Sequence, residues 1–585
     1  MILQALTEYY NALLERGEIS PPGWDNAVKV SFGLELAEDG TLVQVIPYQR
    51  TVKQGKKEKL LNNRLMRIPA HVKRSSGVAA NFLCDTSSYL LGADAKGKPK
   101  RSMECFQDCQ KLHQRLLTDV DTPASRAILA FFDRWQPEQA ATHPLLSPIW
   151  KELTGGANLI FCFGMEPVTK DSAICQAWQR YYNAPAEDAE TGQCLVTGEV
   201  GPIARLHPPI KGVRDASTMG ASLVSFNAPA FESYGHTQGG NAPVSEYAAF
   251  AYTTALNALL ADSQHCQIIG DTTVVCWAQH GEPAYQSMGM MGLFGAAPGI
   301  DDRDLSAALH KLAQGDPVSW ENVTLAPEEH FYFLGLAPNA ARLSVRFFLR
   351  DSFGSFMQNL EKHYQDTAII RPAYDSWENI PLWQLLNETV NQNNHNKAAS
   401  PQLAGDVLRA ILSGTPYPAT LLNGAELRIR AEREVTRGRA AIIKAYYLRL
   451  RNPHPDCPKE ILQMELNETS TNVAYTLGRM FSVYEQIQQA ANPNINTTIK
   501  DKYFNAASAT PASVFPLLGN LAAKHQRVLG RDNKGAAVNL EKKLQKLSTV
   551  IGEAYPTRLN LQQQGSFQLG YYFENQARYQ KKEEK

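Results

Sequence analysis

Apolar and polar positions alternate in the N-terminal half of the chain in the manner of β-strands. Residues 27–48 (AVKVSFGLELAEDGTLVQVIPY) alternate on both sides of Glu38-Asp39-Gly40, which predicts an antiparallel hairpin. Residues 267–279 and 343–349 are short runs rich in β-branched or aromatic residues, and both predict buried strands.

Helical patterns lie between these strands. The first 18 residues (MILQALTEYYNALLERGE) have the pattern of an amphipathic helix, and residues 103–118 predict another. A third helix is expected near Asn241, with Asn241 or Ser245 as its cap and an apolar face continued by Leu256, Leu259 and Leu260. Helices and strands are therefore mixed up to about residue 385.

The pattern changes at a polar spacer that begins at Asn391 (NQNNHNKAASPQ), after which strand signals fade. A Pro-rich break (NPHPDCP, from Asn452) divides the helical remainder. The predicted fold is α+β, with a mixed α/β N-terminal region followed by a C-terminal α-helical bundle. Its predicted parts are residues 1–240 (α/β), 241–390 (α/β core), 391–455 (helical) and 456–585 (helical bundle).

The composition is that of an ordinary globular protein. Of 585 residues, 44% are hydrophobic and 20% are charged. No apolar run reaches the roughly 18 residues of a spanning helix, so no membrane partner is predicted. The first residues lack the basic start and cleavage site of a signal peptide. Nine scattered cysteines, an odd number, are typical of reduced thiols and favour a cytoplasmic protein.

The charges balance, with 58 basic and 58 acidic side chains. A net charge of zero does not exclude nucleic-acid binding, because local cationic stripes on the surface make the contacts. Two basic runs, KQGKKEK from Lys53 and KGKPKR from Lys96, are predicted to be solvated loops.

The strongest charge pattern lies between Leu427 and Arg451. If this segment is one helix, Leu427, Ala431, Val435, Gly438, Ile442 and Tyr446 share its packing face. The opposite side then carries a cationic stripe about 30 Å long, which would span several phosphates. The alternative is a solvated face that forms salt bridges with other elements. The stripe consists of Arg430, Arg433, Arg437, Lys444 and Arg451.

Catalytic motifs are largely missing from the sequence. The chain has no Walker, dinucleotide-binding, zincin or nucleophile-elbow pattern. Residues 210–252 are rich in Gly, Ala, Ser and Asn, but Ala221 and Ser222 follow Gly220 where a phosphate-binding lysine would be needed. The sequence therefore gives no reason to predict a nucleotide cofactor, and no cofactor is predicted.

Two groups of residues have the side-chain types of metal or catalytic sites. Cys105, Cys109 and His113 recur every four residues on one side of a helix, a spacing that zinc can use but that small residues on a helix face also produce. His363 and Asp366 could form a metal-nuclease pair, although no second carboxylate cluster supports them. No metal site is predicted.

Long stretches of the sequence resemble the Csd family, the large subunits of type I-C CRISPR Cascade complexes. The resemblance rests on residues 210–260, on IGDTTVVCWA after them, and on further stretches in the same order. Those stretches are NFLCDTSSYLLG, FYFLGLAPNAARLSVRFFLRDSFG, NVAYTLGRMFSVYEQIQ and FQLGYYFENQARY.

The resemblance implies a non-catalytic subunit of an RNA-guided complex. Such a subunit contacts duplex DNA, recognises the short PAM beside the target, helps to open the duplex, stabilises the R-loop and recruits a helicase–nuclease. The implied partners are the crRNA-containing backbone subunits, small subunits, the target duplex and its displaced strand. The alternatives are a metal-dependent nuclease around His363, Asp366 or the cysteines, and a purely structural scaffold.

Within the matching stretches, we expect DNA contacts where amide or cationic side chains stand among small residues, in the predicted DNA-facing region 1–240 and just after it. The cations of the 427–451 segment are expected to hold the displaced strand. The predicted PAM and DNA contacts are Lys73, Arg74, Ser75, Ser76, Asn81, Lys211, Arg214, Asn227, Gln238 and Asn241.

The resemblance also implies that small subunits arise by internal translation of the large-subunit message. Met464 follows the Pro-rich break and precedes a predicted helix, so a start there would release a helical bundle. Met480 lies inside that helix and is the alternative start.

Overall fold

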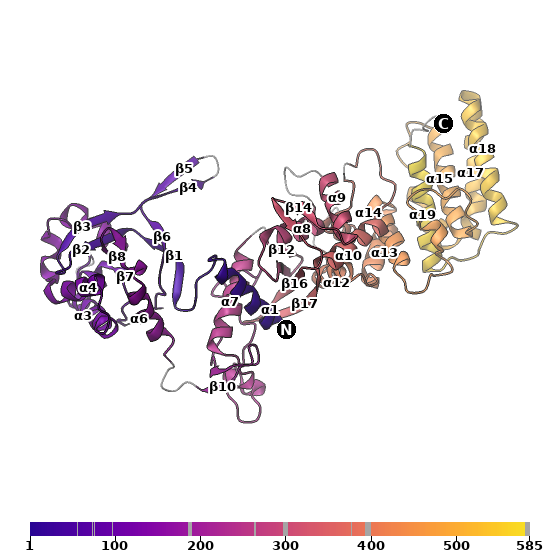
Figure 1. Cartoon of the computed structure of the whole chain (residues 1–585). Coiled ribbons are helices and arrows are strands. Elements are labelled where there is room, and N and C mark those ends of the chain that lie inside the picture. Colours follow the sequence, from indigo (N-terminus) through magenta and orange to yellow (C-terminus); the bar gives the residue numbers. More distant parts are fainter. Residues whose placement is uncertain are drawn as a thin grey trace. The chain divides into compact units, whose positions relative to one another are not determined.

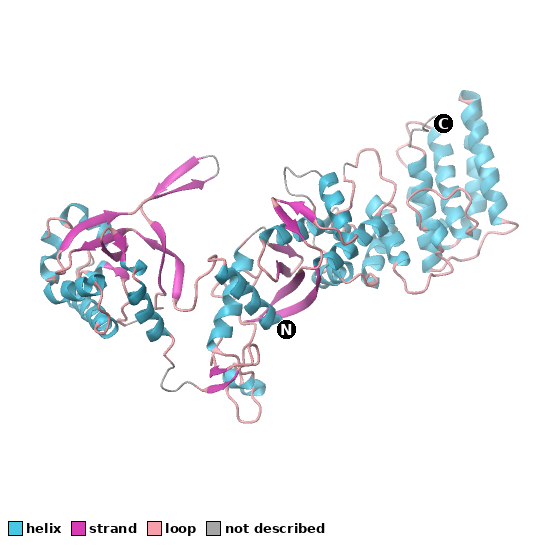
Figure 2. Ribbon diagram, in the orientation of Figure 1, coloured by secondary structure: helices cyan, strands magenta, loops and turns pink. Residues whose placement is uncertain are grey.

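The chain forms two compact units in a computed structural model, one made of Leu3–His207 with Phe226–Thr254 and one of Pro208–Ser225 with Ala255–Lys585 (Figure 1). The predicted α+β class is confirmed, and Figure 2 shows that the C-terminal third is helical. The structure describes residues 1–54, 57–72, 74, 77–95, 98–184, 190–262, 265–295, 302–375, 377–391 and 399–579.

A five-stranded sheet forms the core of the first unit. Its strands run in the order β3-β2-β8-β7, and β9 pairs with β8. The predicted hairpin is confirmed, because β2 pairs antiparallel with β3 across a turn at Ala37–Thr41. The β2–β8 pair is parallel and the β7–β8 pair antiparallel. The strands are β2 (Phe32–Leu36), β3 (Leu42–Pro47), β7 (Cys84–Thr86), β8 (Asn158–Phe163) and β9 (Glu166–Pro167).

Helices pack on this sheet around an aromatic cluster of Phe82, Phe131, Phe132 and Phe161. The predicted helix at 103–118 is confirmed as part of α3, and the N-terminal helix as α1. The helices on the sheet are α2 (Ser87–Leu90), α3 (Pro99–Leu117), α4 (Pro123–Arg134), α5 (Trp150–Thr154) and α6 (Ser172–Tyr182). Helix α1 (Ile2–Glu15) instead packs through Tyr10 on Tyr247 and Phe250.

Three two-stranded ribbons complete the first unit. β1 (Trp24–Val30) pairs with β6 (Arg64–Pro69), β4 (Arg50–Gln54) with β5 (Lys57–Leu61), and β10 (Thr191–Gln193) with β11 (Val200–Pro202). The prediction of a solvated loop at KQGKKEK was wrong, because the backbone on both sides of Gly55-Lys56 is hydrogen-bonded as the β4–β5 hairpin. In the second basic run, α3 already begins at Pro99.

A four-stranded antiparallel sheet of order β12-β13-β16-β17 forms the core of the second unit. The run at 267–279 is two strands joined at Gly270-Asp271, and every residue of β13 is buried as predicted. In contrast, β17 is only partly buried. The strands are β12 (Cys266–Ile269), β13 (Thr272–Ala278), β14 (Val318–Trp320), β15 (Val323–Leu325), β16 (His330–Asn339) and β17 (Arg342–Ser352).

Helix α7 (Glu246–Ala261) leads into this sheet, and its cap is Ser245, whose hydroxyl accepts the N–H of Ala248. The predicted apolar face is confirmed by the burial of Leu256, Leu259 and Leu260. The following helices are α8 (Pro283–Phe294), α9 (Asp302–Ala313), α10 (Phe353–Thr367), α11 (Leu382–Asn387), α12 (Pro401–Leu412), α13 (Ala419–Glu432) and α14 (Arg437–Leu448).

The C-terminal bundle follows the Pro-rich segment, and α15 and α19 form its centre. A Cβ at Gly478 would lie 1.9 Å from the carbonyl oxygen of Phe567, and one at Gly570 would lie 2.0 Å from that of Tyr475. Only glycine therefore allows the two helices to approach this closely. No helix among the described residues is long and apolar enough to span a membrane. The bundle comprises α15 (Val473–Ala491), α16 (Ile499–Ala509), α17 (Pro511–Asp532), α18 (Lys534–Ile551) and α19 (Leu561–Ala577).

Candidate nucleic-acid interface

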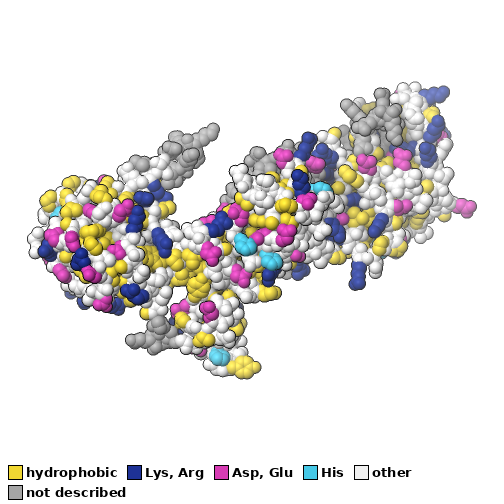
Figure 3. Space-filling model, viewed as in Figure 1, with side chains coloured by type: hydrophobic (Ala, Val, Ile, Leu, Met, Phe, Trp, Pro, Cys, Tyr) yellow, Lys and Arg dark blue, Asp and Glu magenta, His cyan; other side chains and the backbone are white. Residues whose placement is uncertain are grey.

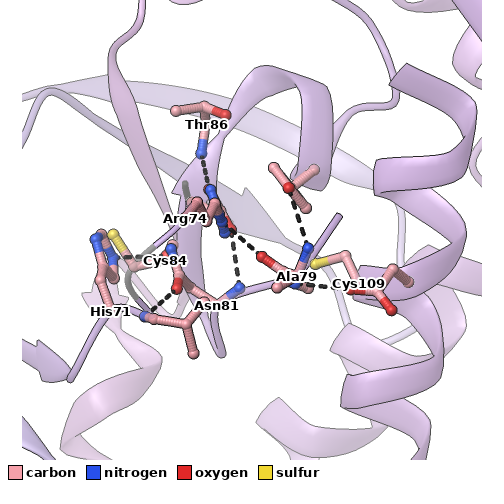
Figure 4. Close-up of polar contacts among 12 residues, drawn as sticks. His71, Arg74, Ala79, Asn81, Cys84, Thr86 and Cys109 are labelled. Carbon is pink, nitrogen blue, oxygen red and sulfur yellow. Dashed lines mark hydrogen bonds and ion pairs between the residues drawn. The ribbon is translucent and has the colours of Figure 1, made fainter. Parts of the chain in front are cut away.

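The loop between β6 and β7 carries the first group of predicted DNA contacts, and it is organised by a buried carboxylate. Asp85 is 1% exposed and accepts hydrogen bonds from the backbone N–H groups of Asn81 (2.9 Å) and Thr86 (2.8 Å). Arg74 donates to both oxygens of Asp85, one of them at 3.0 Å (Figure 4). The guanidinium also lies 3.9 Å above the Tyr89 ring.

Asn81 and His71 close the same loop. The side-chain oxygen of Asn81 accepts the N–H of Val72 at 2.9 Å, and Nε2 of His71 donates to the carbonyl of Cys84 at 3.0 Å. Burial lowers the pKa of His71. Arg74 and Asn81 are thus engaged in holding the loop, because each is bound within it. Lys73, Ser75 and Ser76 lie outside the described residues.

The second predicted group divides between the two units. Lys211 and Arg214 are exposed in the second unit, where the backbone N–H of Lys211 donates to Asn257 and that of Arg214 to Thr273. Arg214 lines a groove of about 430 Å³ together with the carboxylates of Asp215 and Asp271. Those two acidic side chains disfavour a phosphate at this place.

Asn227, Gln238 and Asn241 belong to the first unit. Asn241 accepts the N–H of Ser233 at 2.8 Å and donates to the carbonyls of His236 and Gln238, so it fixes a loop rather than presenting its amide. Gln238 has a positive φ of 44°, and its N–H donates to Glu232. Asn227 is exposed.

The prediction of one helix from Leu427 to Arg451 was wrong. Helix α13 ends at Glu432, Arg433 is left-handed with φ of 56°, and α14 begins at Arg437 with Thr436 as its cap. The Thr436 hydroxyl accepts the N–H of Arg439 at 3.2 Å, which is the local reason for the new start. The predicted packing face is confirmed only in its second half, since Val435, Gly438 and Ile442 are buried whereas Leu427 is 61% exposed.

The predicted cationic stripe is correspondingly not one surface. Arg437 is buried and donates to Asp375 (2.9 Å) and to the carbonyls of Trp377 and Glu378. Lys444 is 3% exposed, and its ammonium donates to the carbonyls of Asp366 (2.8 Å) and Gln365. Burial lowers the pKa of Lys444 to about 8. Arg430, Arg433 and Arg451 remain exposed.

A different set of cations is exposed on the bundle and was missed in the sequence. None of its members forms an ion pair within the described part of the chain. Three recur at i, i+3 and i+7 in α17, which places them on one side of that helix. The signal was the run of cations between residues 511 and 551, a segment that carries only two carboxylates, Asp532 and Glu541. We call these six residues the α17–α18 cations: Lys524, Arg527, Arg531, Lys534, Lys542 and Lys546.

Figure 3 shows Lys and Arg side chains standing on the surface of the C-terminal bundle. Exposed cations without partners keep their full charge available to a polyanion, since no internal carboxylate has to be displaced first. This bundle surface is therefore the part of the predicted helical third that suits phosphate contact.

The three residues with zinc-ligand spacing are core residues. Cys105, Cys109 and His113 are buried, and Nδ1 of His113 donates to the carbonyl of Cys109 while Nε2 accepts the N–H of Leu83. Burial lowers the pKa of His113 to about 4. Both ring nitrogens are thus engaged. Among the described residues, no group of three His, Cys, Asp or Glu side chains could hold a metal.

His363 and Asp366 are likewise bound inside the second unit. Nδ1 of His363 lies 2.6 Å from the Tyr417 hydroxyl, and burial with the nearby Arg449 charge lowers the pKa of His363 to about 3. The carboxylate of Asp366 accepts Nε of Arg449 at 2.7 Å. The two side chains have separate partners, so the arrangement does not resemble a shared metal site.

A comparison with protein families finds a match that covers nearly the whole chain. The family model described as CRISPR-associated protein (Cas_Csd1) matches residues 6–579. A search of curated proteins finds none that matches the chain. The family match spans residues of both compact units.

Proposed function

We propose, from the premise that this chain belongs to the Csd1 family of CRISPR-associated proteins, that it is the non-catalytic large subunit of a type I-C surveillance complex. In that role it recognises the PAM in double-stranded DNA, helps to open the duplex and stabilises the R-loop. It works with crRNA-containing backbone subunits and small subunits, and it recruits the helicase–nuclease.

The observation that carries the proposal is the set of exposed α17–α18 cations. Arg527 and Arg531 stand on one side of α17 without ion pairs to described residues. A strand held by such side chains releases counterions, and its affinity falls with salt. The bundle therefore supports the contact with the displaced strand, a role first expected of the 427–451 segment.

Two features of the sequence remain part of the proposal. The loop 71–83, between β6 and β7, is proposed to face the PAM, with Arg74 and Asn81 shaping it and Lys73, Ser75 and Ser76 contacting DNA. Met464 is 58% exposed and lies ahead of α15, which suits an internal start that yields a small subunit; Met480 is fully buried within α15. In an M464L variant, mass spectrometry should no longer detect a short C-terminal product.

The test uses the complex assembled on a crRNA. It should bind a duplex with the matching target and PAM more tightly than the same duplex with an altered PAM, and omission of this chain should abolish the difference. Equal binding to both duplexes would contradict the proposed PAM role.

The non-catalytic part of the proposal has its own test. The purified chain, incubated with Mg²⁺ or Mn²⁺ and labelled single- and double-stranded DNA, should leave both substrates intact. Cleavage that an H363A variant no longer supports would favour the nuclease alternative.

A further inference from the structure

A groove on the first unit lies between strand β6 and the segment from Glu166 to Cys175. Its volume is about 520 Å³, and its lining includes three cations, Arg64, Arg67 and Lys170, with one carboxylate, Glu166. The lining side chains therefore carry a net charge of +2. The volume lies within the about 300–1,000 Å³ typical of sites that enclose a small molecule or a single nucleotide-sized group.

Arg67 is held in a geometry that suits stacking. Its guanidinium carbon lies 4.9 Å from the centre of the Trp24 ring. Trp24 is 7% exposed, and its indole N–H donates to Gln179 at 2.8 Å, so the ring is a fixed platform. Arg67 itself is exposed, which leaves the second face of the guanidinium accessible. Unstacked nucleobases bind to such planar guanidinium faces.

Arg64 supplies charge without a competing partner. It is exposed on the same strand, and no described carboxylate forms an ion pair with either Arg64 or Arg67. The carboxylate of the groove is already occupied, since Glu166 binds Lys170 at 2.7 Å. A phosphate entering the groove therefore meets two arginines whose donors are not consumed inside the protein.

The walls of the groove add an apolar surface. Met66 is buried beside the two arginines in β6, and Leu65, at 42% exposure, and Pro167 also line the space. The groove thus combines cations for a phosphate with an apolar wall and a guanidinium plane for a base. These features match a nucleotide of a single strand, whose base and phosphate are both accessible. A duplex hides its base faces in the stack, so only its phosphates could use this site.

We propose that this groove binds a phosphodiester-linked nucleotide of a single strand, with the base on Arg67 and an adjacent phosphate at Arg64. The proposal rests on the nucleic-acid-binding function above and names a second place, apart from the α17–α18 cations, where a strand is held. The shared chemistry fits single-stranded DNA and RNA alike, and the test separates the two.

The test measures fluorescence anisotropy of labelled dT12, rU12 and a 20-base-pair duplex with the full chain over a range of salt. R64A/R67A should weaken binding of the preferred single strand about fivefold or more, because the stacking contact at Arg67 and the phosphate contact at Arg64 are lost. The slope of log affinity against log salt should fall by about 0.7, the value for one phosphate of a single strand. R67K, which keeps the charge but lacks the planar fork, should lose affinity while keeping the slope.

The matched control is K151A/R180A, which removes two exposed cations of the same unit that do not line the groove. It should bind single strands like the wild type. If R64A/R67A weakens binding of dT12, the groove holds DNA. If it weakens binding of rU12, the groove holds RNA. A strand carrying 5-iodouracil should also photocrosslink to the peptide that contains Leu65 and Met66.

The experiment gives one result if the groove proposal is wrong and a different result if the proposed function is wrong. If the wild type binds the probes and R64A/R67A matches K151A/R180A, the groove proposal is overturned while DNA recognition stands. Equal losses on the duplex and on single strands would also overturn it, since general phosphate attraction would explain them. If the wild type binds none of the probes, both proposals fail.

Discussion

Helix α14 and the α17–α18 pair are both rich in cations but differ in where those cations lie. In α14, Arg437, Arg439 and Lys444 are each less than a tenth exposed and bind carboxylates or backbone carbonyls. In α17 and α18, cations such as Arg527 and Lys546 are exposed and form no ion pair with described residues. The same side-chain types therefore stabilise the fold in one region and remain available for a ligand in the other.

The comparison predicts that substitutions in α14 lower the stability of the fold, whereas substitutions in α17 and α18 weaken binding to a polyanion. Buried ion pairs cost several kcal/mol when one partner is removed, because the other charge is left without compensation. Exposed cations contribute little to stability but add to the affinity for a polyanion.

The largest effect is expected at Arg439. It is 1% exposed and binds the carboxylates of Glu388 and Glu432 together with the carbonyl of Glu434 at 3.0 Å. R439A should lower the free energy of unfolding by about 3–5 kcal/mol, measured by urea denaturation. R527A, which removes an exposed arginine of α17 that forms no ion pair with described residues, should cost less than about 1 kcal/mol. Similar losses in the two variants would remove the distinction between the regions.

A charge reversal at Arg437 should behave in the same way. Its guanidinium is surrounded by Asp375 and two carbonyls, so a glutamate there would bring like charges together in a buried place. R437E should reduce the yield of folded protein, whereas R433E, at the exposed left-handed position between the helices, should not.

The second effect is a pH dependence of the free energy of unfolding that is caused by Lys444. Burial lowers its pKa to about 8 in the folded chain, while the unfolded value is about 10.4. Between these values the unfolded chain binds more protons, so the free energy of unfolding should rise with pH. From pH 7.5 to 9.5 the wild type should gain about 2 kcal/mol relative to K444M.

The measurement is urea denaturation of both proteins at each pH, with K546M as the control. Lys546 is exposed, and its substitution should leave the pH dependence unchanged. A constant difference between wild type and K444M over this range would mean that Lys444 keeps an ordinary pKa.

Two neighbouring lysines of α18 test the comparison within one helix. Lys543 forms an ion pair with Glu574, which is fully buried and also accepts Nε of Arg479 at 2.9 Å, whereas Lys542 is exposed. K543A should cost about 1–2 kcal/mol, since Arg479 still compensates the carboxylate. K542A should change stability by less than about 0.5 kcal/mol in the same urea titration. Equal costs would show that burial of the partner is unimportant here.

The sequence predicted the elements whose signals are local. The hairpin around Gly40 and the helices at the N-terminus, at 103–118 and after Ser245 depend on turn residues, caps and periodicity within a few positions. The break at Arg433 was missed although Thr436 and its capping bond are also local, because the apolar period continued across them.

The candidate site was harder to predict because its side chains depend on distant partners. Asp375 and the carbonyls that bind Arg437 lie about 60 positions earlier in the chain, and the carbonyls that bind Lys444 lie about 80 positions earlier. A helical wheel shows only the residues of one helix and not the partners on other elements. It therefore predicted that both cations face the solvent. The contacts of Arg74 and Asn81 could not be read from the sequence for a related reason, since Asp85 binds the guanidinium of Arg74 and the backbone N–H of Asn81 in a loop that has no period.

The smallest energetic effect is expected on the α17–α18 cations, and it should appear in binding alone. R527E/R531E should leave the urea midpoint within the error of the wild type, because neither arginine has a described ionic partner to lose. Affinity for a single-stranded dT20 probe should fall about tenfold at low salt, and less at 0.3 M NaCl, where the cations contribute less. R433E/R451E is the control, since it reverses the same amount of charge at two exposed arginines on either side of α14. If that control weakens dT20 binding as strongly as R527E/R531E does, the strand follows the total charge of the chain, and the α17–α18 cations are not a distinct surface.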